Sequence, residues 1–156
     1  MKPKSAGMTL IELMIVVAIV ALLASMIRAG GYRAGSFTSP HLVDYRERIR
    51  VNGEQVSEVS LTAAFERIAD ARGQDSLTFF EFNTLAALLV FETAAPDATV
   101  LEVGMGGRLD AVNLVDADVA VLVSVGLDHM EWLGADVEAI GREKAGIFRS
   151  GRPAIV

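Results

Sequence analysis

An uninterrupted apolar segment near the N-terminus constrains the fold of this 156-residue chain more than any other feature. Residues 8–27 read MTLIELMIVVAIVALLASMI and contain a single charged side chain, that of Glu12. As a helix this segment would extend roughly 30 Å, which is the thickness of a bilayer core. A buried helix of a small domain usually keeps a polar stripe, whereas this segment is apolar on every side. It therefore predicts one long apolar helix of the transmembrane type.

The residues around this segment distinguish between kinds of membrane sequence. Lys2 and Lys4 precede it, and a positive flank of this kind stays on the cytoplasmic side of a membrane. A secretory signal peptide has a shorter apolar stretch that is followed by its cleavage site, whereas here Gly7 precedes the apolar run. A lone acid inside a membrane segment is costly, which makes Glu12 a candidate functional residue.

These residues resemble the N-terminus of type IV prepilins and pseudopilins, in which a short basic leader ends in glycine before a sequence such as MTLIELMIVVAIV. The resemblance implies cleavage after Gly7 by a prepilin peptidase, methylation of Met8, and a role for Glu12 in aligning subunits in a fibre. The family usually has Phe at the first mature position, so Met8 is a departure. Residues 1–7 would then be a leader, and residues 8–27 would insert into the inner membrane as part of a pilin-like or pseudopilin-like subunit.

Composition narrows the function of the remaining chain. The sequence is 52% hydrophobic and has a net charge of −6, which argues against nucleic-acid binding, because nucleic-acid-binding proteins normally present a basic face. It contains no cysteine, which excludes disulfide bonds and thiolate metal sites. The stretch RAGGYRAGS at 28–36 is rich in glycine and arginine and is the best candidate for a boundary. It places a second domain at residues 28–156.

Helical patterns and short apolar runs alternate along this second domain. Helical patterns occupy residues 61–73, 77–96 and 135–146, and β-branched runs bounded by glycine occupy residues 98–104 and 118–126. Runs of this kind are typical of strands that are buried on both faces. The alternation predicts an α/β domain with a mainly parallel sheet. A further apolar run, PAIV, begins at residue 153, and an unfinished strand predicts that the domain is truncated.

Polar side chains follow the predicted strands, at the sheet edge where α/β proteins collect their chemistry. Ser39 closes a short apolar run, Glu102 ends the run at 98–103, and His129 follows the run at 118–125. A hydroxyl, a carboxylate and an imidazole at one edge can hold Mg²⁺, which keeps several waters and takes few protein ligands. The alternative is that Ser39 caps a turn, Glu102 is solvated and His129 is hydrogen-bonded, and the spacing alone leaves both interpretations open.

Lys144 is the one lysine that follows the leader. At positions 28–156 the other permanently positive side chains are all arginines. A lysine can act as a neutral amine, either as a nucleophile or by taking up CO₂ as a carbamate, and an arginine cannot. Its presence in GREKAGI therefore indicates a chemical role. The alternative is a solvated lysine on a helix face beside Glu143, and the sequence favours neither.

Several motifs resemble the bifunctional folylpolyglutamate synthase/dihydrofolate synthase family of Mur-ligase-like ATP-dependent ligases. In chain order they are AGGYRAGSFTSPHLVDYRERIRVNGE, LTFFEF, LEVGMGGRLDAVN, GLDHMEWLG and REKAGIFRSGRP. The resemblance implies that ATP phosphorylates a carboxylate of dihydropteroate or a folate. The acyl phosphate is then attacked by the amino group of L-glutamate, which gives an amide, ADP and phosphate. The fold implied is an incomplete Mur-ligase-like nucleotide-binding domain.

The same resemblance implies roles for individual residues. Ser39, Glu102 and His129 match the family's Mg²⁺ ligands. Lys144 matches a carbamylated lysine that helps to position the metal. The positions that match contacts with the pterin-containing substrate are Thr78, Phe79, Phe80, Glu81 and Leu109.

The family's phosphate-binding loop has no counterpart in this sequence. Such a loop is rich in glycine, carries a lysine and cradles phosphates with backbone N–H groups at a helix start. It should lie shortly before AGGYRAGSFTSPH, but residues 11–25 read IELMIVVAIVALLAS, without glycine or lysine. The C-terminal domain that helps to bind ATP and glutamate also has no counterpart. We therefore expect the chain as printed to lack ligase activity.

The two resemblances imply different compartments. A prepilin places the residues after its helix outside the cytoplasm, whereas ATP and folate precursors are cytoplasmic. The ligase part therefore implies a cytoplasmic location, and the helix implies the inner membrane. Arginines that follow the apolar run closely oppose export, and they are Arg28, Arg33, Arg46, Arg48 and Arg50. The simplest account of these conflicts is a chimeric or misassembled reading frame, with the two parts meeting near residues 18–24.

Overall fold

The computed structural model describes the backbone of residues 10–156 and the side chains of residues 15–156. These residues form two compact units, the first Met14–Glu102 and the second Val103–Val156 together with residues 10–13. The division between the units falls after Glu102. This division does not test the domain boundary predicted at residue 28, which stays a prediction.

Helix α1, Leu10–Ala29, occupies the described part of the apolar segment, and it ends where two glycines follow, Gly31 with a φ of 88°. Within the residues described, no helix combines the length and the apolarity that a membrane crossing needs. The transmembrane-type helix predicted at 8–27 is therefore not found in this part of the chain.

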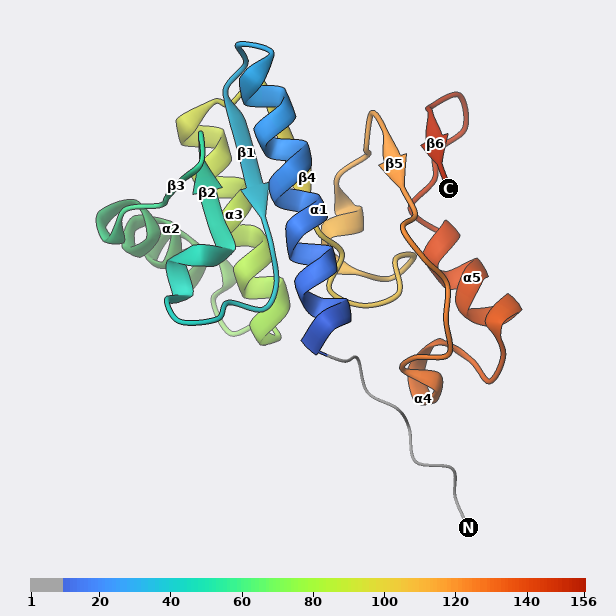
Figure 1. The fold of residues 1–156 in the computed structure, drawn as a ribbon. Helices are drawn as coiled ribbons and strands as arrows, with labels where there is room; N and C mark the ends of the chain where they lie inside the picture. Colours follow the sequence, from blue (N-terminus) through green and yellow to red (C-terminus); the bar gives the residue numbers. More distant parts are fainter. Residues whose placement is uncertain (1–9) are drawn as a thin grey trace. The chain divides into compact units, whose positions relative to one another are not determined.

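The first unit is built on a four-stranded sheet of order β3-β2-β1-β4 (Figure 1). Its strands are β1 Ala34–Phe37, β2 Ile49–Val51, β3 Glu54–Gln55 and β4 Ala98–Leu101. Strands β1 and β4 are parallel, with Ser36 opposite Val100, whereas the β1–β2 and β2–β3 pairs are antiparallel. The sheet is thus mixed, and the prediction of a mainly parallel sheet was wrong for it.

A tight hairpin explains the antiparallel part of the sheet. Asn52 and Gly53 connect β2 to β3, with φ of 53° and 87°. Two consecutive residues with positive φ form the turn whose twist matches paired antiparallel strands, and Asn-Gly is the sequence that favours it. The 3₁₀ helix η1, Tyr45–Arg48, lies between β1 and β2 and reverses the chain before this hairpin.

Helix α3, Phe79–Ala94, packs on one face of this sheet, and helix α2, Glu58–Arg72, packs against α3. Strand β1 turns Gly35 and Phe37 toward α3: an added Cβ on Gly35 would lie 2.9 Å from Cε1 of Phe91, and the Phe37 and Phe80 ring centroids are 5.8 Å apart. Phe37 and Ala86 are fully buried. The core of the first unit therefore lies between β1 and α3.

Helix α1 lies on the opposite side of the sheet from α3 (Figure 1). Ala34 and Ser36, which alternate with the residues facing α3, are also buried, and so are Val20 and Ala24 on one face of α1. Leu22 is 60% exposed. The described part of α1 therefore has a buried side and an exposed side, although its sequence is apolar all round.

The second unit contains mostly short elements. They are η2 Ala111–Leu114, β5 Ala120–Val121, α4 Met130–Leu133, α5 Val137–Ala145 and β6 Ala154–Ile155. Strands β5 and β6 form a parallel pair. The strand predicted at 118–126 was expected to be buried on both faces, but only Ala120 is buried, while Val119 and Val123 are each 51% exposed. That prediction was wrong because β5 pairs with β6 alone among the described residues.

Charged contacts hold the second unit together. The guanidinium of Arg108 contacts both carboxylate oxygens of Glu143, with Nη2 3.0 Å from Oε1. Arg149 donates from Nη2 to Oδ1 of Asn113 at 2.9 Å, which ties the residues after α5 to η2. Arg152 pairs with Asp118 at 2.7 Å, next to the β5–β6 pair.

Candidate functional site

Two of the predicted metal ligands lie side by side in the first unit. Glu102 directly follows β4, and Ser39 follows the end of β1, so the parallel pairing of these strands brings them to one edge of the sheet. The backbone N–H of Ser39 donates to Oε2 of Glu102 at 2.6 Å. The backbone N–H of Glu102 in turn donates to the carbonyl oxygen of Phe37 at 3.0 Å, which extends the β1–β4 ladder.

The electrostatics of Glu102 suit a cation ligand. Partial burial raises the pKa of its carboxyl group, while the hydrogen bond from Ser39 and the positive charge of Arg48 lower it. Loss of solvation is the largest of these effects, so the charged form lacks the water that would stabilise it elsewhere. A divalent cation would restore that stabilisation, and Glu102 with the neighbouring Ser39 hydroxyl offers the oxygen ligands that Mg²⁺ prefers.

A buried arginine lies beside this pair and was not identified from the sequence. Arg48 is 6% exposed, and its Nε donates to Nδ1 of His41 at 2.8 Å. Its Cζ lies 5.2 Å from the ring centroid of Phe79 and 5.9 Å from that of Tyr45. Burial lowers the pKa of the Arg48 guanidinium, and the charge of Glu102 opposes that effect. In the sequence alone, nothing distinguishes Arg48 from its neighbours Arg46 and Arg50.

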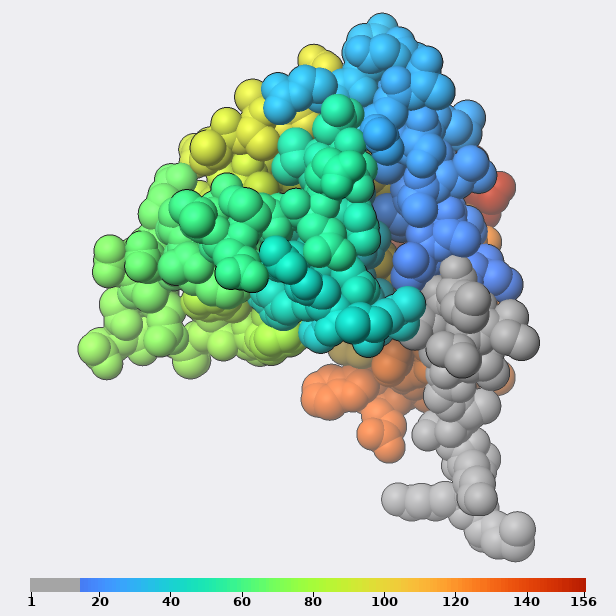
Figure 2. All heavy atoms as spheres, turned by 60° about the vertical axis from the view of Figure 1, so that its left-hand side comes forward, coloured from blue at the N-terminus to red at the C-terminus, as the bar shows by residue number. Residues whose placement is uncertain are grey.

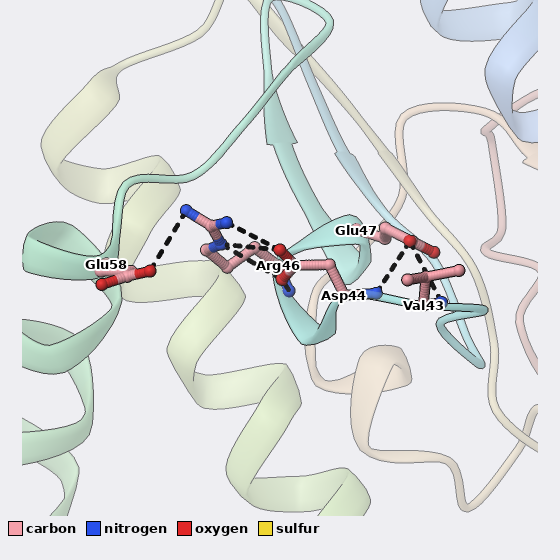
Figure 3. A network of polar contacts seen from close by, with 5 residues as sticks. All are labelled: Val43, Asp44, Arg46, Glu47 and Glu58. Carbon is pink, nitrogen blue, oxygen red and sulfur yellow. Dashed lines mark hydrogen bonds and ion pairs between the residues drawn. The ribbon is translucent and has the colours of Figure 1, made fainter.

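A polar network fixes the loop that carries these groups (Figure 3). Asp44 caps η1 by accepting from the backbone N–H of Arg46 at 2.9 Å, and it also pairs with the Arg46 guanidinium at 2.7 Å. The carboxylate of Glu47 accepts from the backbone N–H groups of Leu42, Val43 and Asp44. Arg46 also reaches Glu58 at 3.6 Å, which connects η1 to the start of α2.

Figure 2 shows that η1 and the loop before it lie at the surface of the first unit. Leu42 and Val43 in this loop are 65% and 91% exposed, yet their backbone N–H groups are bonded to Glu47. The loop is therefore an ordered surface feature next to the Ser39–Glu102 edge. It offers apolar side chains to whatever approaches that edge.

The predicted pterin-contacting residues of LTFFEF begin α3, and the structure gives them different environments. Thr78 and Glu81 form a capping box, in which Oγ1 of Thr78 accepts from the Glu81 N–H and Oε2 of Glu81 accepts from the Thr78 N–H. Phe80 packs on Phe37 in the core. Phe79 is 62% exposed and is the ring that touches Arg48. The substrate roles predicted for these residues stay predictions.

The remaining predicted site residues belong to the second unit. His129 precedes α4 in the left-handed conformation, with φ of 49°, and its Nε2 lies 3.5 Å from Oδ2 of Asp128. Lys144 lies in the last turn of α5, and Leu109 is 80% exposed. The hydrogen-bonded alternative for His129 and the metal-ligand prediction are both compatible with this geometry, so the roles of His129, Lys144 and Leu109 stay predictions.

Some predictions concern residues that the structure does not describe in full. Gly7 and Met8 lie outside the described residues, and for Glu12 only the backbone, within α1, is described. Residues 11–25, where a phosphate-binding loop would be expected, lie within α1. Across the part of the chain described, no three His, Asp or Glu side chains converge, so a metal site here would draw on other donors such as the Ser39 hydroxyl.

Residues 53–156 match the Mur ligase middle domain. The chain belongs to this family. Residues 2–27 separately match the prokaryotic N-terminal methylation motif. Both resemblances inferred from the sequence are thereby confirmed.

Individual relatives show which members of this family the chain resembles. The dihydrofolate synthase/folylpolyglutamate synthase of Escherichia coli K12 is 59% identical over 134 residues, which cover 86% of this chain and 32% of that protein. The Haemophilus influenzae protein of the same name is 46% identical over 135 residues, or 86% of this chain and 31% of that protein. This chain therefore spans about a third of the length of these relatives.

Solved structures agree with this assignment. E. coli FolC in complex with DHPP and ADP matches with a TM-score of 0.85 and 57% identity, covering 86% of this chain and 33% of that one. The bifunctional folylpolyglutamate synthase/dihydrofolate synthase with Mn, AMPPNP and L-glutamate bound matches with a TM-score of 0.80 and 53% identity, covering 85% of this chain and 32% of that one. The predicted Mur-ligase-like α/β fold is thereby confirmed.

Proposed function

We propose that this chain carries the metal-binding edge and the pterin-binding wall of an ATP-dependent ligase that adds L-glutamate to dihydropteroate or a folate through an acyl phosphate. The observation that carries the proposal is the hydrogen-bonded Ser39–Glu102 pair at the ends of two parallel strands. The 59% identity to the E. coli synthase supports the same substrate class. The ligase part would act in the cytoplasm, where these substrates occur.

In this proposal the residues of the chain hold and orient the reactants. Ser39 and Glu102 would be ligands of Mg²⁺, and the family resemblance gives His129 the same role and Lys144, as a carbamate, a positioning role. The metal would supply charge neutralisation on the transferred phosphoryl group. Thr78, Phe79, Phe80 and Glu81 would contact the pterin-containing substrate, and the resemblance gives Leu109 the same role. In α3 the capping box fixes Thr78 and Glu81, so this wall is organised before a ligand binds.

We also propose that the printed sequence binds substrate without turning it over. Residues 14–25 lie within α1 beyond its first four residues, where backbone N–H groups are bonded to carbonyls of the preceding turn. They therefore cannot form the nest of free N–H groups that grips ATP phosphates. Metal and pterin binding depend on residues elsewhere in the chain and do not require that nest.

Three measurements on the full chain test these statements. Titration calorimetry with dihydropteroate in MgCl₂ should give saturable binding, and a coupled assay with ATP and glutamate should give no ADP above background. Mn²⁺ binding, followed by electron paramagnetic resonance, should be lost in Glu102→Gln. It should be kept in the control variant Glu92→Gln, because the Glu92 carboxylate is exposed and pairs with Arg67. Absence of dihydropteroate binding would overturn the pterin proposal, and glutamate-dependent ADP release would overturn the proposed inactivity.

A second candidate function rests on the match of residues 2–27 to the N-terminal methylation motif. In this case a prepilin peptidase would cut after Gly7, Met8 would be methylated, and Glu12 would align subunits. Co-expression with a prepilin peptidase tests this directly. Intact-mass measurement should show loss of residues 1–7 and gain of one methyl group, and Gly7→Val should abolish both. An unprocessed chain alongside a processed control pilin would exclude this function.

A further inference from the structure

Arg48 is a buried charged side chain whose strongest donors are unused. Its Nε is bonded to His41, but among the described residues neither Nη1 nor Nη2 donates a hydrogen bond. Burying a guanidinium without partners is costly, and buried polar groups are normally satisfied. No fully buried side-chain nitrogen or oxygen lacks a partner in the described part of the chain, so Nη1 and Nη2 must reach the surface. The side chain is thus mostly enclosed, and the small surface that it exposes includes its forked end.

The surroundings of Arg48 hold the fork in one orientation. The hydrogen bond to Nδ1 of His41 fixes Nε, and the rings of Tyr45 and Phe79 lie beside the guanidinium. The loop network of Figure 3 fixes η1, at whose end Arg48 lies. A preorganised fork loses little entropy when it binds a planar anion, and its two parallel donors match a carboxylate. The arrangement has the features of an anion-binding group.

The position of Arg48 indicates which part of a ligand it would meet. Phe79, a largely exposed ring in the predicted pterin wall, lies beside the guanidinium. The charge of Glu102 also acts on Arg48, although the two side chains form no ion pair. A carboxylate bound to Arg48 could therefore be attached to an aromatic ring that lies against Phe79.

We propose that Arg48 binds the carboxylate of an aryl-carboxylate substrate through Nη1 and Nη2, while the ring of that substrate lies against Phe79. This inference rests on the proposed function and deepens it, because it assigns the group that recognises the carboxylate to be phosphorylated. Arg48 would place this carboxylate at the Ser39–Glu102 edge before any metal binds. It also explains why a charged side chain is buried with its fork unpaired.

The test compares an acid with its amide. Titration calorimetry of the full chain is carried out in EDTA, so that a metal cannot hold the carboxylate, with dihydropteroate and with its carboxamide. The wild-type chain should bind the acid at least tenfold more tightly than the amide, since the amide cannot accept two charge-assisted hydrogen bonds. Arg48→Met should bind both alike and weakly, and Arg48→Lys should keep part of the preference, because lysine retains the charge without the fork.

Arg46→Met is the matched control, because Arg46 lies in the same 3₁₀ helix but points to Asp44 and Glu58. It should leave the acid-to-amide ratio unchanged. Equal affinity of the wild-type chain for acid and amide would overturn the role of Arg48 while leaving the pterin proposal intact. Failure to bind either ligand would overturn both. Should circular dichroism show that Arg48→Met does not fold, the wild-type ratio and Arg48→Lys still decide the question.

Discussion

The backbone N–H of Ser39 lies 2.6 Å from Oε2 of Glu102, and this contact joins the carboxyl ends of the parallel strands β1 and β4. It engages one oxygen of the carboxylate and leaves Oε1 without a donor among the described residues. The side chain is therefore oriented by the fold and still has a free oxygen. This is the condition that a metal ligand requires, since orientation by neighbouring groups lowers the cost of binding.

Glu102→Gln should change how stability depends on pH. The folded-state pKa of Glu102 is raised, mainly by burial, so the carboxyl group favours folding when protonated and disfavours it when charged. Its favourable contribution is present below the unfolded pKa and is lost as the pH rises through the folded pKa. Thermal unfolding in EDTA should therefore show Glu102→Gln gaining stability relative to wild type as the pH rises from about 4 to 7.

Adding Mg²⁺ or Mn²⁺ at pH 7 supplies the control for this prediction. The cation should raise the melting temperature of the wild-type chain and leave that of Glu102→Gln unchanged, because the charged carboxylate then has a partner. A pH-independent difference between the two proteins in EDTA would contradict the raised pKa of Glu102.

The contribution of Asp44 to stability should have the opposite pH dependence, because it should be lost as the pH falls. Its pKa is lowered from 3.8 to about 2 by hydrogen bonds from the Arg46 side chain and backbone. The charged carboxylate therefore favours folding, and its contribution is present above the unfolded pKa and is lost as the pH falls toward about 2. The melting temperature of wild type should exceed that of Asp44→Asn above pH 5, and the gap should close toward pH 2. A gap that stays constant would show that the ionised form is not what caps η1.

Thr78→Ala should destabilise α3 by about 1 kcal/mol, because it removes the cap of the first turn. Thr78→Ser keeps the hydroxyl and should restore most of that stability in urea unfolding. Thr93→Ala serves as the control, since the Thr93 hydroxyl bonds only to the Leu89 carbonyl within the same helix. The pair of Thr78 variants also separates stability from substrate binding. Weakened dihydropteroate binding in a fully stable Thr78→Ser chain would indicate a direct contact with the ligand.

Gly35→Ala should cost about 1 to 3 kcal/mol through overpacking. An added Cβ would lie 2.9 Å from Cε1 of Phe91 and 3.1 Å from Cγ2 of Thr99. Phe91 is buried and has little space to withdraw, whereas Thr99 is exposed. Phe91→Leu should recover part of the loss in the double variant. Gly126→Ala, where an added Cβ meets nothing within 4 Å, should leave stability unchanged. Similar chemical unfolding curves for both alanine variants would contradict the close contact between β1 and α3.

The sequence predicted the larger helices because their signals are local. Predicted helices at 77–96 and 135–146 correspond to α3 and α5, whose starts are capped by Thr78 and Asp136. Glu102 was identified for a similar reason, since a carboxylate directly after a β-branched run lies at a strand end whatever the rest of the sheet does.

The errors came from contacts that are distant in sequence. Pairing of β1 with β2 made the sheet mixed, although Asn52–Gly53 was a local signal for the hairpin and was not used. Arg48 could not be recognised, because its role depends on His41 and on Phe79, which lies on α3. The buried face of α1 was also unpredictable, since an all-apolar sequence does not indicate which side packs on a sheet.

Lys144 provides the last prediction, because its two interpretations differ in chemistry. It lies in the last turn of α5, and its carbonyl oxygen would be only 2.8 Å from a Cβ added to Gly107, so the backbone at this position is closely held. In ¹³C-bicarbonate the full chain should show one carbamate signal by NMR. The variant Lys144→Arg, which retains Lys2 and Lys4, should lose this signal. Identical spectra for the two proteins would leave Lys144 as a solvated helix residue and would remove it from the proposed metal site.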